Sequence, residues 1–343
     1  MTLCNHIKLM LASMAMLLSV SLWAQDGSTA YNFLNVTPSS HAYALGGHNI
    51  SVIDHDIMLV EQNPSLLGPE MNKQLGLNYM RYIGGSNFAG ARYGQGAGKH
   101  AAWGVALQYF GYGSMEGYDQ TGVKTGKFNA SDIAMNVTYS HDINDYFRGG
   151  ITAKYLYSKY EAYTAGAVAV DLGVNYYNPL YEFSASIVVK NLGGQIKKFA
   201  DARDKLPVDL QVGATKLISG TPFRVSLTAY GLTKWYLPYY TPADKNNAES
   251  ELVKHNSFGD NLLRHLVFGA EFLPNNNMYV ALGYNHRTRT DMSSYQRSFL
   301  SGFSAGAGLR TRAFTFGVAV AQPHNGATTF MLNVCTSLGE LMR

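Results

Sequence analysis

The sequence predicts an all-β protein, a fourteen-stranded antiparallel transmembrane β-barrel preceded by an N-terminal hatch segment. Three observations support this prediction. After about residue 73, large apolar residues alternate with small or polar ones, and this period of two is that of a β-strand. The links between the alternating segments are short and long in turn. No apolar stretch of about eighteen residues offers a helical membrane span instead.

The composition agrees with many short strands joined by tight turns. Of 343 residues, 15% are charged and 13% are aromatic, with 24 Tyr and 35 Gly, a balance that is unusual for a cytosolic enzyme. The chain has no long basic run, so nucleic acid is not an expected partner. It also lacks a convincing cofactor motif, and we expect no cofactor.

The first 24 residues read as a secretory signal peptide. Lys8 is the only positive charge before the apolar run 9–22, and Ala24 offers a cleavage site before Gln25. Cleavage would leave Cys335 as the only cysteine, so no internal disulfide is expected. The chain is therefore predicted to be exported.

The next segment, residues 25–72, is predicted to be a hatch inside the barrel. It contains five potential metal ligands within fourteen positions: His48, Asp54, His55, Asp56 and Glu61. Three consecutive side chains do not converge easily on one ion, whereas Asp and Asn near turns commonly cap helices or bond to the backbone. Polar packing is therefore the preferred interpretation, and an ion bound to the 48–61 cluster is the alternative left open.

Residues 73–343 are predicted to form the barrel itself. In 102–109, for example, Trp103, Val105 and Leu107 lie on one side of the strand, and Ala102, Gly104 and Ala106 on the other. The large side would face lipid and the small or polar side the lumen. Inward positions include Asp171, Asp209, Arg224, Glu271 and Asn333. The predicted strands are 73–82, 85–94, 100–110, 129–142, 146–158, 164–177, 181–191, 207–217, 223–233, 264–273, 277–286, 298–311, 313–321 and 328–338.

The lengths of the links predict which rim faces which side of a bacterial outer membrane. Links after even-numbered strands are short turns, and the longest links follow odd-numbered strands: 111–128, 192–206, 234–263 and 287–297. Outer-membrane barrels have short periplasmic turns and longer extracellular loops. Outer-membrane lipid is therefore the expected surrounding of the wall.

Two motifs that resemble catalytic loops do not fit their required context. "GFSAG" (302–306) matches a nucleophile elbow, but that motif needs a strand followed by a helix, and here the chain continues as strand. "GQGAGKH" (94–100) lacks the first glycine of a phosphate loop and has His100 where Ser or Thr is required. An enzyme is therefore not expected. A hydrolase in particular would need a catalytic base and a residue that orients it, and neither can be identified in the sequence.

Residues 31–67 carry a family resemblance that continues through 267–287 and 303–324. They resemble the PorV/PorQ family of the type IX secretion system, which is similar in architecture to FadL-type outer-membrane barrels. The resemblance implies a fourteen-stranded barrel with its N-terminal segment folded into the lumen. It also implies that Asn63 and Pro64, together with Asp54 and Asp56, form the hatch motif.

The same resemblance implies a function and partners. PorQ-type barrels are expected to hold a PorZ-like surface protein, beside PorU/PorV-type components, so that secreted cargo is attached to anionic lipopolysaccharide. The link 234–263 is the candidate partner-contact loop, because Trp235, Tyr236, Tyr239 and Tyr240 give it the aromatic density of an interaction hot spot. These aromatics could equally lie in the membrane interface. The alternative function is that of a FadL-type transporter of hydrophobic small molecules.

Overall fold

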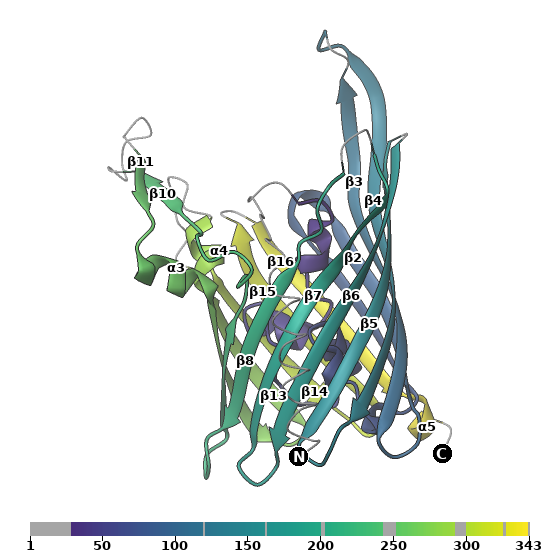
Figure 1. Ribbon diagram of the computed structural model, residues 1–343, viewed down its shortest axis with the longest axis vertical. Helices are drawn as coiled ribbons and strands as arrows, with labels where there is room; N and C mark the ends of the chain where they lie inside the picture. Colours follow the sequence, from purple (N-terminus) through teal and green to yellow (C-terminus); the bar gives the residue numbers. More distant parts are fainter. Residues whose placement is uncertain are drawn as a thin grey trace, which may run out of the picture.

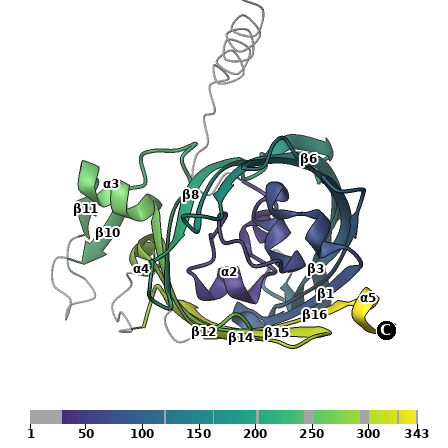
Figure 2. The same cartoon turned by 90° about the horizontal axis from the view of Figure 1, so that it is seen from below.

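The computed structural model describes residues 29–118, 121–161, 163–199, 203–242, 252–291, 300–324 and 327–341. The predicted signal peptide, 1–24, lies outside them. Within the described residues, fourteen antiparallel strands close into one barrel in which β1 pairs with both β2 and β16 (Figures 1 and 2). Two further strands, β10 and β11, pair only with each other. The predicted fourteen-stranded barrel is confirmed.

The strands of the wall follow the predicted segments closely. Their bounds are β1 Gln74–Arg81, β2 Asn87–Gly96, β3 Ala101–Tyr118, β4 Lys124–Asp142, β5 Phe147–Tyr160, β6 Tyr163–Asn178, β7 Phe183–Lys197, β8 Asp209–Leu217, β9 Phe223–Ala229, β12 Leu266–Asn275, β13 Met278–Asn285, β14 Phe303–Arg310, β15 Phe314–His324 and β16 Ala327–Ser337.

Residues that alternate in polarity along a strand also alternate between exposed and buried positions in the structure. In β3, Leu107 is 49% exposed on the outside, whereas its neighbour Gln108 is 4% exposed and faces inward. The same pattern runs through β6, where Val168, Leu172 and Val174 are exposed. A closed sheet also pairs the backbone groups of every strand, which is the condition for a sheet in lipid.

The long links are more ordered than predicted. The link 111–128 was expected to be a loop, but β3 and β4 continue through most of it as a tall two-stranded hairpin (Figure 1). Side chains on both faces of this extension are largely exposed, so no buried face imposes a visible period of two. The link 234–263 likewise contains β10 (Tyr239–Pro242), β11 (Leu252–His255) and most of helix α3 (Phe258–His265), and 287–297 begins within α4 (His286–Asp291).

The N-terminal segment lies within the barrel (Figure 2). It consists of short helices joined by extended backbone: η1 Asn32–Asn35, α2 Ser40–Ala44, η2 Ile57–Glu61, η3 Pro64–Leu66 and η4 Pro69–Met71. Outside this segment, η5 (Ile83–Gly85) links β1 to β2 and α5 (Leu338–Leu341) follows β16. None of the described helices has both the length and the hydrophobicity needed to cross a membrane.

Candidate functional site

The described part of the hatch, residues 29–72, contacts most of the circumference of the wall. Helix α2 lies against β13, β14, β15 and β16, and η2 lies against β1 and β2. Farther round the wall, η4 contacts β2 and β3, and η3 contacts β4, β5 and β6. The hatch side chains are mostly buried, among them Leu45, Ile50, Ile57 and Leu67. The interior is therefore a packed interface between hatch and wall.

Asn63 and Pro64 fit against two glycines of the wall. Gly150 of β5 and Gly173 of β6 are direct register partners. A Cβ at Gly150 would lie 2.4 Å from the carbonyl carbon of Pro64, and one at Gly173 would lie 2.2 Å from Asn63 Oδ1. Only glycine permits this approach. Other inward glycines meet the hatch in the same way: Gly76, Gly94, Gly269, Gly283, Gly306 and Gly317.

The Asn63 side chain also links two parts of the hatch. Its Nδ2 donates to the carbonyl of Ile50 at 2.9 Å, and its Oδ1 accepts from the backbone N–H of Ser65 at 2.9 Å, which caps η3. Asp56 caps η2 by accepting from the N–H of Met58 at 2.9 Å, and it also accepts from Cys335 Sγ at 3.2 Å. Both residues thus have a structural role in this arrangement.

Asp54 belongs to an ionic cluster at the end of the lumen next to the short turns, which we call the turn side; the opposite end, next to the long links, is the loop side. We call this group the His41 cluster (His41, Asp54, Arg224, Glu271 and Arg310). His41 Nδ1 lies 3.0 Å from Asp54 Oδ2, and its Nε2 lies 2.5 Å from Glu271 Oε1. Arg224 donates to both Glu271 oxygens at 2.7 and 2.9 Å, and Arg310 pairs with Asp54 at 3.1 Å. The cluster therefore ties α2 and the extended hatch backbone to β9, β12 and β14.

The electrostatics of this cluster keep His41 protonated. Burial alone lowers the pKa of His41, but the carboxylates of Glu271 and Asp54 outweigh it and raise the pKa to about 9. Burial raises the pKa of Asp54, yet His41 and the two arginines bring it down to about 2. Tyr279 stacks on the imidazole, with ring centroids 3.9 Å apart. His41 is thus a buried cation between two carboxylates.

A pH dependence follows from the raised pKa of His41. A group whose pKa is raised on folding stabilises the fold below its unfolded pKa, here 6.5, and loses that effect as pH rises through its folded pKa, about 9. We expect the difference in melting temperature between the wild type and His41→Gln to be largest below about pH 6.5 and to shrink as pH rises through about 9. Thermal unfolding of the detergent-solubilised barrel at a series of pH values measures this, and a constant difference would contradict it.

A second cluster anchors the middle of the hatch, which we call the Glu61 cluster (Glu61, Arg92, Asn136, Lys154 and Asp171). Glu61 pairs with Arg92 of β2 and lies 3.2 Å from Lys154 Nζ of β5. Asn136 of β4 donates to Glu61 at 3.0 Å, and Lys154 also pairs with Asp171 of β6 at 2.6 Å. Burial raises the pKa of Glu61, but Lys154 and Arg92 lower it to about 2. Glu61 is therefore a buried carboxylate bound by three strands.

The side chains of the candidate metal cluster do not converge on one site. Among the residues that the structure describes, no three His, Cys, Asp or Glu side chains are placed to hold one ion. Asp54 and Glu61 belong to the two ionic clusters, and Asp56 caps η2. His48 stacks on Tyr230 with centroids 4.0 Å apart, and the partly exposed His55 lies 3.5 Å from Glu70. Each residue has its own separate contact with the surrounding protein.

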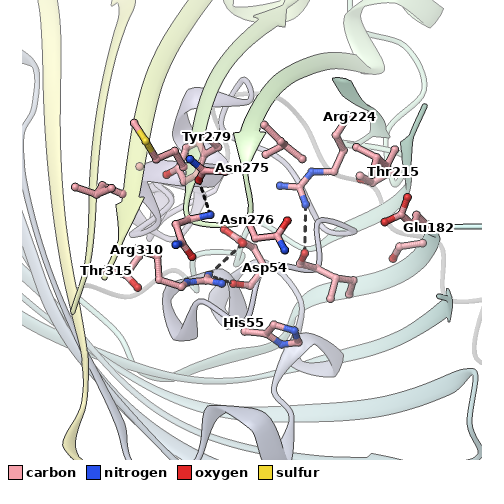
Figure 3. Close-up of a pocket in the computed structure, with 18 of the residues that line it drawn as sticks. Asp54, His55, Glu182, Thr215, Arg224, Asn275, Asn276, Tyr279, Arg310 and Thr315 are labelled. Carbon is pink, nitrogen blue, oxygen red and sulfur yellow. Dashed lines mark hydrogen bonds and ion pairs between the residues drawn. The ribbon is translucent and has the colours of Figure 1, made fainter. Parts of the chain in front are cut away.

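Cavities remain at both ends of the hatch. The turn-side cavity, about 440 Å³, has Asp54 between Arg224 and Arg310, with Asn275 and Asn276 at its edge (Figure 3). The loop-side cavity, about 380 Å³, is lined by polar residues such as Asn32, Asp209 and Arg287. Both cavities expose charged and amide groups, which suit water and polar ligands better than hydrocarbons.

The apolar part of the lumen is filled by the chain itself. Phe33 and Leu34 of η1 are buried in one cluster with Met80, Phe88 and Phe110 of the wall. The rings of Phe33 and Phe110 lie 6.5 Å apart. A hydrophobic molecule would have to displace η1 to enter this apolar compartment.

The candidate partner-contact loop divides into packed and exposed aromatics. Trp235 stacks on His265 at 5.0 Å, and Tyr239 stacks on His255 at 4.7 Å, so both rings support the local fold. Tyr236 and Tyr240 are instead 66% and 50% exposed. The sequence does not separate these two pairs of aromatic residues, because His255 and His265, which pack against Tyr239 and Trp235, lie farther along the chain.

The two catalytic-looking motifs are structural. Ser304 of "GFSAG" lies on β14, where its hydroxyl donates to the carbonyl of Ala44 at 2.8 Å and accepts from the N–H of Gly46 at 3.0 Å. It holds the end of α2 against the wall, and the chain continues as strand through this motif, as predicted. "GQGAGKH" (94–100) forms the end of β2 and the turn before β3, as predicted.

Comparison with known proteins relates this arrangement to solved barrels. No family model and no curated protein matches the chain. The toluene transporter TbuX from Ralstonia pickettii is 11% identical, with a TM-score of 0.52, covering 89% of this chain and 98% of its own. The CymD monoaromatic hydrocarbon channel is 11% identical, with a TM-score of 0.53, covering 90% and 99%. A FadL homologue from Pseudomonas aeruginosa is 11% identical, with a TM-score of 0.50, covering 88% and 98%. The chain therefore shares the fold of FadL-type outer-membrane barrels.

Proposed function

We propose that the chain is a non-enzymatic outer-membrane barrel, closed by its own hatch, that holds a partner protein on its loop side. One observation carries the proposal: the hatch is fixed to the wall by the His41 cluster, the Glu61 cluster and the glycine contacts. Such a lumen makes a rigid base, and the elaborated parts of the chain are the hairpins and helices of the loop rim (Figure 1). Two observations support an outer-membrane location: the fold is that of solved outer-membrane barrels, and the outer face of the wall is apolar.

The resemblance of residues 31–67 to the PorV/PorQ family supports the identity of the partner. On this proposal a PorZ-like surface protein binds the loop rim, beside PorU/PorV-type components, so that secreted cargo is joined to anionic lipopolysaccharide. Tyr236 and Tyr240 are the exposed aromatics that would anchor such a contact, because exposed tyrosines on a rim are typical hot-spot residues.

We expect Tyr236→Ser with Tyr240→Ser to abolish co-purification of the surface partner with the barrel. Hot-spot aromatics each contribute about 2 kcal/mol or more, so loss of two would lower affinity more than a hundredfold. Affinity isolation from outer membranes, with identification of the retained proteins, measures the effect. Tyr118→Ser, in the equally exposed end of the β3–β4 hairpin, is the control and should retain the partner. Equal retention by both variants would remove this surface from the proposal.

The comparisons favour a second function more directly than the first, namely passage of hydrophobic small molecules. TbuX and CymD are described as a toluene transporter and a monoaromatic hydrocarbon channel. The apolar compartment around Phe88 and Phe110 would serve such molecules once η1 moved. The packed lumen and the polar cavities favour the first proposal, since fold alone does not determine function.

Uptake distinguishes the two functions. Cells lacking other hydrocarbon channels would take up radiolabelled toluene through a transporter, and Phe33→Ala with Leu34→Ala would change the rate by opening the apolar compartment. A docking barrel gives no uptake above that of cells without it, yet still retains its partner. Uptake without partner retention would establish the transporter instead.

A further inference from the structure

Helix α3 has the reverse of the burial pattern of a soluble surface helix. Phe258, Leu262 and Leu263 are 70%, 37% and 43% exposed, whereas Asn261, Arg264 and His265 are buried. A helix on a soluble protein turns its apolar face to the core. Helix α3 turns that face away from the protein.

Specific polar contacts hold this inverted orientation. Asn261 accepts from the N–H of Leu237 at 2.7 Å and donates to the carbonyl of Ser257 at 2.9 Å. Arg264 bonds to Thr290 and Asp291 of α4. His265 lies between two carbonyls, with Nδ1 2.7 Å from that of Tyr230 and Nε2 3.1 Å from that of Trp235. Asn261, Arg264 and His265 each have hydrogen-bond partners on the protein side, so these contacts hold the apolar face of α3 outward.

The apolar face lies beside the outer surface of the barrel. Figure 2 shows α3 outside the ring of strands, and it contacts α4. The chain passes directly from α3 into β12, whose outward Phe268 is exposed, as is Leu227 of the paired strand β9. The side chains of α3 thus continue the outward apolar surface of the wall at its loop-side end.

A hollow of about 430 Å³ on the outer wall adds a second observation. It is lined mainly by apolar side chains, including Ile187, Val212 and Leu227, and Leu266, the residue after α3, also lines it. Ala185 of β7, Ala214 of β8 and Ala229 of β9 are small outward residues that leave this space. An apolar hollow on a wall facing hydrocarbon matches an acyl chain better than a polar protein surface.

We propose that α3 rests in the lipid interface of the outer leaflet, with Phe258, Leu262 and Leu263 among acyl chains and a lipid tail in the hollow beneath. The apolar side chains leave water, as in interfacial helices that lie along a membrane surface. The position of α3 in the interface would fix the height of the β10–β11 hairpin above the membrane. The inference rests on the proposed outer-membrane location.

Nitroxide labels test the placement. Cysteines replace Phe258 and Leu262 one at a time in the full chain carrying Cys4→Ser and Cys335→Ser, purified and reconstituted in phosphatidylcholine vesicles. Label relaxation by oxygen, which concentrates in lipid, is compared with relaxation by a water-soluble nickel chelate. Position 282 on the wall is the lipid reference and position 116 on the β3–β4 hairpin is the water reference. We expect positions 258 and 262 to lie closer to position 282 than to position 116, as labels in the interface should.

The references separate the possible failures. Water-like values at 258 and 262 with a lipid-like value at 282 would overturn the inference and leave the location of the barrel intact. A water-like value at 282 would overturn the proposed membrane location itself. Labels at 258 and 262 that are shielded from both reagents in native outer membranes, but water-exposed in vesicles, would mean that a protein covers α3, which also overturns the inference.

Discussion

Replacement of Glu61 by glutamine is expected to destabilise the contact between hatch and wall by about 3–5 kcal/mol, because it leaves Arg92 and Lys154 buried without the carboxylate that both contact. Glutamine has nearly the same shape as glutamate, so the lost stability comes from removal of the negative charge. We expect a lower melting temperature and an ion conductance that the wild type lacks. Thermal unfolding in detergent and single-channel recording in planar bilayers measure the two effects.

Glu70 offers a matched control for Glu61. It is the other glutamate of the hatch, and although burial raises its pKa, His55 and Arg148 lower it to about 2. It lies at the rim, however, and is partly exposed, so its ion pair with Arg148 is screened by solvent. Glu70→Gln should cost only about 0–1 kcal/mol. Equal effects of the two substitutions would show that burial of the Glu61 cluster does not anchor the hatch.

Gly173→Ala is expected to displace Asn63 and Pro64 from the wall. The added Cβ would lie 2.2 Å from Asn63 Oδ1 and 3.1 Å from Pro64 Cδ. The Asn63 side chain cannot move freely, since it already bonds to Ile50 and Ser65. Overpacking of this kind costs about 1–3 kcal/mol. We expect faster protease cleavage of the hatch in the folded barrel and a lower melting temperature.

Gly194→Ala in β7 is the control for the glycine contact. Gly194 is also a strand glycine, but a Cβ added there meets no atom within 4 Å. Alanine at such a position is neutral or mildly stabilising, because it restricts the unfolded chain. If Gly173→Ala behaved like Gly194→Ala, close packing of the glycine pair against the hatch would not matter for stability.

The wall was predictable from the sequence because each strand carries its own signal. Alternation of large apolar and small or polar residues repeats in most wall strands, since one side of the wall faces outward and the other faces the packed lumen. The outward-facing β3–β4 extension was predicted as a loop because water surrounds both of its faces. The two strands remain hydrogen-bonded in this extension, but neither face is buried, so apolar residues are not required at every second position.

The contacts of the hatch could not be predicted in detail, because they join residues far apart in the chain. Asp171, Arg224 and Glu271 were recognised as inward charges, which already indicated that partners exist in the lumen. The partners themselves, such as His41 for Glu271, depend on the path of the hatch. Gly150 and Gly173 look like ordinary strand glycines until Asn63 and Pro64 are placed beside them.

The pairing of Gln74 with Ser337 joins the two ends of the described barrel and sets an order of assembly. The seam between β1 and β16 forms only after the last strand has been synthesised, while the segment to be enclosed precedes the first strand. That segment can enter sideways, between β1 and β16, only before the seam forms, because a completed ring admits it only through its ends. Nearly the whole polypeptide is one loop bounded by this pairing, which makes the final step non-local and slow.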